Sequence, residues 1–130
     1  MTRKKNIQEI ATITEPVTIE ETTSENSLRR NLEEIKTYDG VIGYILRNST
    51  SAAIDLKDPT KIIDYAILSS SAFDASKELS ELFELGNAKN ILVEGKDAKA
   101  LSVVIGENKI SVFMNKSADH KKVLKRLNVF

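Results

Sequence analysis

The sequence is poor in the residues that build disulfides, metal centres and membrane spans. Its 130 residues include no cysteine, no tryptophan and one histidine. Without cysteine the chain has no disulfide and no thiolate metal ligand, which fits a reducing compartment. No apolar run approaches the ~20 residues that cross a bilayer. The first residues, Met1 to Lys5, lead into a mixed polar stretch and not into the apolar core of a signal peptide. We therefore expect a cytoplasmic protein that has no membrane partner.

The charges of the sequence also balance. Lys and Arg total 19, Asp and Glu total 19, and the formal net charge is zero. No global field therefore attracts nucleic acid. In the basic C-terminal stretch, no aromatic residues interleave with the basic ones as they do in stacking platforms, so we expect no nucleic-acid partner. With 41% hydrophobic residues, the chain can bury the core of one folded domain.

The N-terminal stretch differs in composition from the rest. Met1–Thr23 is rich in Thr and Glu and contains no aromatic residue. We expect a flexible N-terminal tail over 1–23 and a folded domain over 24–130. An alternative is an added edge strand over Ala11–Ile19, where apolar and polar residues nearly alternate around Pro16, because proline is tolerated only at the edge of a sheet.

Hydrophobic spacing and turn residues predict an α+β fold with the order α-β-β-α-β-β-β-α. The expected helices are 24–39, a long one over 59–85 that Asp58 and Pro59 begin and Gly86 ends, and a short one after Ser117. The expected strands are 41–46, 52–56, 88–94, 100–105 and 109–115. The loops between neighbouring strands are short, which indicates antiparallel pairing in one five-stranded sheet.

The long helix carries two apolar stripes. At 100° per residue, one narrow arc contains Leu68, Ala72, Ala75, Leu79 and Leu82. A second line, about 140° away around the axis, contains Ile62, Ala66, Ser69 and Phe73. A small domain needs one stripe to cover its own sheet, so the other predicts a partner surface. The alternative is a bend at Ser69–Ser71 that keeps both stripes on one core.

No group of residues has the pattern of a catalytic, cofactor or metal site. His120 has a single acidic neighbour, Asp119, which is a poor ligand set. Ser69–Ser71 lies inside a helix and not in a nucleophile elbow. Gly40–Gly43 lacks the further residues of phosphate-binding and dinucleotide-binding loops. We expect a protein that is not an enzyme and that binds no cofactor and no metal.

The C-terminal helix is basic, with Lys121, Lys122, Lys125 and Arg126 on it. Cations near a helix C-terminus stabilise the helix dipole, and a solvated face explains them. The functional alternative is a docking patch for an acidic surface of a protein partner.

The chain resembles the roadblock family, the dynein light-chain domain that also occurs in bacterial and archaeal GTPase regulators. The resemblance covers about 24–129. It lies in Gly40–Leu46 after a short helix, in Leu82–Gly86 at the end of the long helix, and in Ile91–Glu94 before a final hairpin. It implies the strand order 2-1-5-4-3, with the long helix on one face of the sheet and two shorter helices on the other.

The resemblance also implies a function. Roadblock domains form homodimers or heterodimers with a paralogue, in which the long helices pack side by side and the third strands pair. Such dimers are noncatalytic platforms for small Ras-like GTPases. In this chain the resemblance assigns the dimer interface to Leu68, Ala72, Ala75, Leu79 and Leu82, or to Ile62, Ala66 and Phe73, together with Ile91, Leu92 and Val93.

The strand assignment has a reason of its own. A strand that follows a crossing helix tends to lie at a sheet edge, and Ile91–Val93 is apolar on both faces. A different function remains open as an alternative, namely a cytosolic ligand-sensing domain of profilin-like or PAS-like build. That domain needs a cavity between the sheet and the long helix, near the small residues Ala66, Ala72 and Ala75.

Overall fold

The computed structural model describes the backbone of residues 16–127 and the side chains of residues 26–127. It divides into two units, residues 1–31 and residues 32–130. The described part of the first unit is helical, as the first turns of helix α1 (Pro16–Ile35). The second unit contains the end of α1 and every other element, and the account below concerns this unit.

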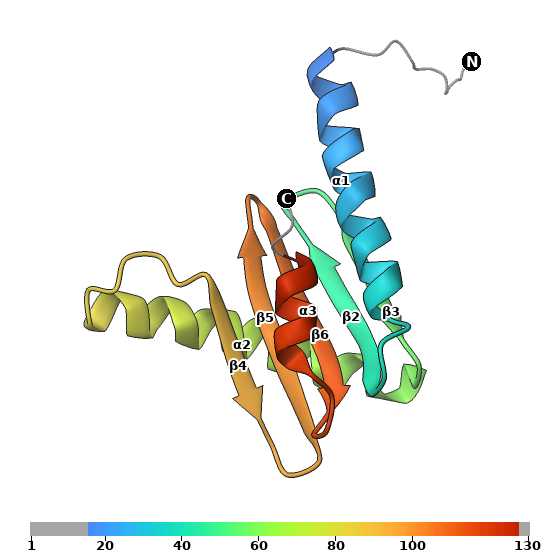
Figure 1. Ribbon diagram of the computed structural model, residues 1–130. Coiled ribbons are helices and arrows are strands. Elements are labelled where there is room, and N and C mark those ends of the chain that lie inside the picture. Colours follow the sequence, from blue (N-terminus) through green and yellow to red (C-terminus); the bar gives the residue numbers. More distant parts are fainter. Residues whose placement is uncertain (1–15, 128–130) are drawn as a thin grey trace. The chain divides into compact units, whose positions relative to one another are not determined.

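One antiparallel sheet of five strands forms the centre of the second unit. In chain order the strands are β2 (Val41–Arg47), β3 (Ala52–Leu56), β4 (Asn90–Glu94), β5 (Ala98–Ile105) and β6 (Asn108–Asn115). Their order in the sheet is β3-β2-β6-β5-β4, which confirms the predicted order 2-1-5-4-3. Helix α2 (Ile62–Leu82) lies on one face and helix α3 (His120–Leu127) on the other (Figure 1).

The chain crosses from one edge of the sheet to the other through α2. Strand β3 at one edge leads into a 3-10 turn, η1 (Pro59–Lys61), then into α2, and then into β4 at the opposite edge. Asp58 begins η1 as predicted, because its Oδ1 accepts a hydrogen bond from the Thr60 amide at 3.0 Å. The C-terminal end of α2 extends past β4 in Figure 1.

Helix α2 ends earlier than predicted. It stops at Leu82, and Glu84, not Gly86, adopts the left-handed conformation that closes it, with φ +54°. The Leu85 amide donates to the Ser80 carbonyl at 2.9 Å, which is the hydrogen bond of a Schellman cap. Glycine usually occupies this left-handed position. Gly86 therefore predicted a helix end two residues beyond the residue that adopts the conformation, Glu84.

The two faces of the sheet bury different sets of side chains, since residues alternate across each strand. On the α2 face, Ile45, Ala100 and Phe113 form a cluster that Tyr65, Ala66 and Leu68 of α2 pack against. On the α3 face the buried side chains include Leu101, Val112 and Met114 of the strands and Val123 and Leu127 of α3.

A bulge in β2 requires a glycine. The register with β6 shifts between Val41 and Gly43, which makes Ile42 an extra residue in β2. At Gly43 a Cβ atom would lie 2.2 Å from the Asp55 backbone oxygen of β3. The two strands therefore approach too closely for any side chain at this position.

Helix α1 begins at Pro16, eight residues before the predicted Ser24, and ends at Ile35 instead of Asp39. Leu28, Leu32 and Ile35 recur at intervals of four and three residues along α1, and all three are buried. The part of the alternative edge strand that the structure describes, residues 16–19, is helical. The remainder of that strand, and residues 1–15 of the predicted tail, lie outside the described residues.

Candidate protein-interaction surfaces

One predicted stripe of α2 lies on the sheet. Phe73 is buried, and Ile62 and Ala66 are half-buried. Tyr65 stacks on Phe113 with ring centroids 4.5 Å apart, and Ser69 Oγ lies 2.6 Å from Ser111 Oγ. Small residues thus bring the helix close to the sheet, and these contacts occupy part of the layer where the ligand-sensing alternative would place a cavity.

The second stripe opens toward solvent along the helix. Ala72 is buried and Leu68 is half-buried, but Ala75 is exposed, Leu79 is 46% exposed and Leu82 is 68% exposed. The helix continues without a break through Ser69–Ser71. The apolar surface that the sequence assigned to a partner is therefore uncovered in the C-terminal half of α2.

Four further apolar side chains are exposed on α2 and just beyond its end. Phe83 and Leu85, just beyond the end of α2, are each 68% exposed. On the outer side of the same helix, Ile63 is 71% and Ile67 is 61% exposed. The sequence analysis did not assign these four residues to a partner surface. The i, i+4 spacing of the two isoleucines does indicate that they share one face of the helix.

Strand β4 is one edge of the sheet, as the sequence predicted. It pairs only with β5, in a register that sets Leu92 opposite Leu101. Ile91 and Leu92 are half-buried, and Val93 is 37% exposed. The outer side of β4 therefore presents backbone groups that no other described strand meets.

The basic residues of α3 separate into two groups. The Lys122 ammonium lies 4.3 Å from the ring centroid of Tyr38, and Arg126 forms an ion pair of 2.7 Å with Glu34. Lys121 and Lys125 are exposed and form no ion pair with any of the side chains described, those of residues 26–127. Of the four predicted docking residues, these two are free to meet a partner.

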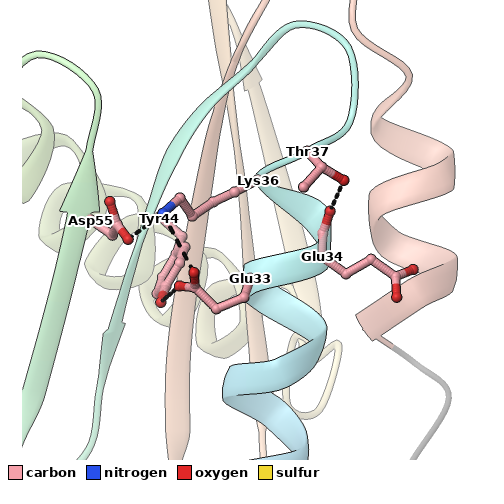
Figure 2. Close-up of polar contacts among 6 residues, drawn as sticks. All are labelled: Glu33, Glu34, Lys36, Thr37, Tyr44 and Asp55. Carbon is pink, nitrogen blue, oxygen red and sulfur yellow. Dashed lines mark hydrogen bonds and ion pairs between the residues drawn. The ribbon is translucent and has the colours of Figure 1, made fainter.

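An ionic network that the sequence analysis missed joins the end of α1 to β2 and β3. Lys36 Nζ lies 2.5 Å from Asp55 Oδ2, and the Tyr44 hydroxyl donates to Glu33 Oε2 at 2.7 Å (Figure 2). The hydrogen bond to Asp55 raises the pKa of Lys36 above its ordinary value, outweighing the opposite effect of burial. This network holds the last turn of α1 on the face of the sheet that carries α3.

A small hollow lies beside α3. It has a volume of about 240 Å³, and its lining includes Tyr38, Val41, Asp119 and Lys122. Asp119 Oδ1 accepts hydrogen bonds from the Lys121 and Lys122 amides. The free N–H groups of α3 that could have bound an anion there are therefore already satisfied by the chain itself.

The described residues contain no arrangement typical of chemistry. His120 is the first residue of α3, and its Nδ1 lies 2.9 Å from Lys99 Nζ. Among the side chains that the structure describes, residues 26–127, no three His, Asp or Glu gather closely enough to hold a metal ion. Within the same span, no helix combines the length and apolarity needed to cross a membrane.

Comparison with known proteins finds solved structures with a similar fold. No family model and no curated protein matches the sequence. A Roadblock/LC7 domain from Streptomyces avermitilis has a TM-score of 0.61 at 12% identity, covering 78% of this chain and 85% of that one. Myxococcus xanthus MglB has a TM-score of 0.63 at 12% identity, covering 77% and 85%.

A third solved structure, MglB with a tetrameric arrangement, has a TM-score of 0.60 at 17% identity and covers 78% of this chain and 79% of that one. At these identities the likeness concerns the fold. The chain has the roadblock fold, as its resemblance to that family implied.

Proposed function

We propose that the protein is a noncatalytic homodimer that scaffolds or regulates a small Ras-like GTPase. The observation that carries the proposal is the apolar surface left uncovered on the C-terminal half of α2 and on the edge strand β4. Leu79 and Leu82 are exposed on the helix, and Val93 is exposed on the strand. Exposed apolar patches of this kind mark protein interfaces, and the roadblock fold makes a second copy the natural partner.

The hydrogen bonds of β4 specify which of its backbone groups face outward. The Gly95 amide donates to Ala98 and the Val104 amide donates to Lys89, so these pairs are hydrogen-bonded pairs of the antiparallel ladder. Such pairs alternate with pairs that exchange no bond. The amides and carbonyls of Asn90, Leu92 and Glu94 therefore point away from β5.

These three residues define a symmetric pairing. In an antiparallel dimer with a two-fold axis through Leu92, each Leu92 faces the other copy's Leu92, and Asn90 faces Glu94. All three pairs then exchange backbone hydrogen bonds. The Asn90 amide also lies beside the Glu94 carboxylate, and Ile91 lies opposite Val93 on the α2 face.

Single cysteines test this register, because the native chain has none. Leu92→Cys places two thiols on residues whose Cα atoms lie ~5.5 Å apart in a hydrogen-bonded pair, within disulfide range. We expect Leu92→Cys to cross-link with itself under mild oxidation. Asn90→Cys and Glu94→Cys should each stay monomeric on a denaturing gel, because equivalent residues lie ~13 Å apart, four residues along the strand.

The matched control mixes the two silent variants. Asn90→Cys and Glu94→Cys together should cross-link after subunit exchange, since the register makes them direct neighbours. Failure of Leu92→Cys and of the mixture to cross-link would contradict pairing through β4. Self-association that persists without either cross-link would assign the dimer to a different surface.

The GTPase partner is proposed to dock on the α3 face. Lys121 and Lys125 are exposed and one helical turn apart, which suits two carboxylates of an acidic surface. Lys121→Glu with Lys125→Glu should abolish capture of a GTPase from the native cell, while circular dichroism and the dimer mass stay unchanged. Lys96→Glu, in an exposed turn, is the control for a charge reversal away from α3. Retained capture by the double variant would refute this docking surface.

A further inference from the structure

A row of four residues crosses the sheet on its α2 face, at the end that carries the turns 48–51 and 106–107. In register, Val104 of β5 faces Lys109 of β6, Lys109 faces Arg47 of β2, and Arg47 faces Ala52 of β3. Val104 is 40% exposed, Lys109 and Ala52 are exposed, and Arg47 is half-buried. The row forms an accessible rim of the sheet.

Two cations stand directly opposite each other in this row. Like charges at opposed positions of an antiparallel pair destabilise the sheet. Both are held toward one ring, since Arg47 Cζ and Lys109 Nζ each lie 5.8 Å from the centroid of Phe73 on α2. Phe73 is itself buried, so it fixes the two cations on the rim and compensates part of their repulsion.

Among the described side chains, residues 26–127, no carboxylate neutralises the pair. With the side chains of residues 26–127, neither Arg47 nor Lys109 forms a salt bridge, and the Arg47 guanidinium donates no hydrogen bond to an atom of those residues. A bond of 3.1 Å from the Asn48 side chain to Asn108 joins β2 and β6 beside the pair. Phe73 and the strand register therefore hold the two cations next to each other. The five N–H donors of the Arg47 guanidinium and the Lys109 ammonium remain available for hydrogen bonds to a ligand.

From this geometry we propose that the rim is a second docking site, which takes an acidic segment of a protein partner. A carboxylate of that segment binds between Arg47 and Lys109 and accepts hydrogen bonds from the guanidinium. Apolar neighbours of the carboxylate cover Val104 and Ala52. The proposal rests on the proposed function only in taking the partner to be a protein, and the rim lies on strands other than β4.

The occupant is argued from the chemistry of the row. A planar guanidinium matches a carboxylate bidentately, and the flanking residues of the row are apolar, which suits a peptide segment better than a free inorganic ion. Two like charges at opposed strand positions lower the stability of the sheet. Unfavourable local arrangements of this kind are typical of functional sites.

The test uses the full chain and three probes in NMR titrations that follow the Arg47 Nε–Hε signal. The probes are a capped peptide with two glutamates between leucines, the same peptide with glutamines, and inorganic phosphate at equal ionic strength. We expect saturable binding of the glutamate peptide at a Kd on the order of millimolar. The glutamine peptide and phosphate should each bind at least about fivefold more weakly.

Lys109→Glu separates binding from stability. It should abolish peptide binding and also raise Tm by about 2 °C or more, because the new carboxylate pairs with Arg47 in place of the repulsion. Lys96→Glu should change neither quantity. Equal binding of both peptides, tighter binding of phosphate, or a Lys109→Glu variant with lower Tm and intact binding would each overturn the proposal, whatever the outcome for the dimer.

Discussion

Replacing Leu82 by glutamine should weaken the proposed dimer while leaving the monomer folded. Leu82 is 68% exposed in the single chain, so its side chain contributes little to the monomer's own core. Glutamine has nearly the helix propensity of leucine and adds no charge to the end of α2. The unfolding free energy of the monomer should therefore change by less than about 0.5 kcal/mol.

The expected effect on association follows from that exposed fraction. Complete burial of a leucine side chain stabilises by about 1.5–3 kcal/mol, so burial of the exposed two thirds contributes about 1–2 kcal/mol. In a two-fold interface the substitution occurs twice, which gives about 2–4 kcal/mol. At 1.4 kcal/mol for each factor of ten, the dimer Kd should rise about 30-fold to 700-fold.

Sedimentation equilibrium over a wide concentration range measures this change. Ile54→Gln is the matched control, because Ile54 is 44% exposed on the same face of the sheet but belongs to the opposite edge strand, β3. Its Kd should equal that of the native chain. An unchanged Kd for Leu82→Gln, or a larger effect of Ile54→Gln, would refute the assignment of the interface to the C-terminal half of α2 and the β4 edge.

Three further predictions concern the fold. Gly43→Ala should lower the unfolding free energy in denaturant by about 3 kcal/mol, because its Cβ would lie 2.2 Å from the Asp55 oxygen; a loss under 1 kcal/mol would show that β2 and β3 separate easily. Glu84→Gly should raise it by about 0.5–1 kcal/mol, since it removes left-handed strain and a negative charge at the end of α2, and a lower Tm would contradict this. The pKa of Lys36 is raised by its bond to Asp55, so the stability that this bond contributes is complete below pH ~10.5 and is lost as pH rises through the folded pKa. The stability difference between the native chain and Lys36→Met should therefore shrink in alkaline titration, and a constant difference up to pH 11 would exclude the linkage.

The order of elements and the sheet topology were predictable because they depend on local signals. Alternating apolar residues, short turns and the Asp58–Pro59 start fix the elements and their antiparallel pairing. Boundaries were less predictable. Helix α2 ends on Glu84 in a conformation that glycine usually supplies, and α1 begins at Pro16 inside a stretch whose composition indicated a tail.

The interaction surfaces were predictable only in part. The helical period gave both stripes of α2, but not which of them faces the sheet, since that depends on Ser69 meeting Ser111. The basic helix was visible, but the pairing of Arg126 with Glu34 was not. The opposition of Arg47 and Lys109 depends on the register of two strands more than 60 residues apart, which no local pattern in the sequence encodes.

The mass of the native protein in solution tests the central claim most directly. The chain has a mass of 14.5 kDa. Sedimentation equilibrium at micromolar concentration should return about twice that value, because a second copy covers the exposed surface of α2 and β4. A particle of 14.5 kDa that persists at 100 times that concentration would contradict the account.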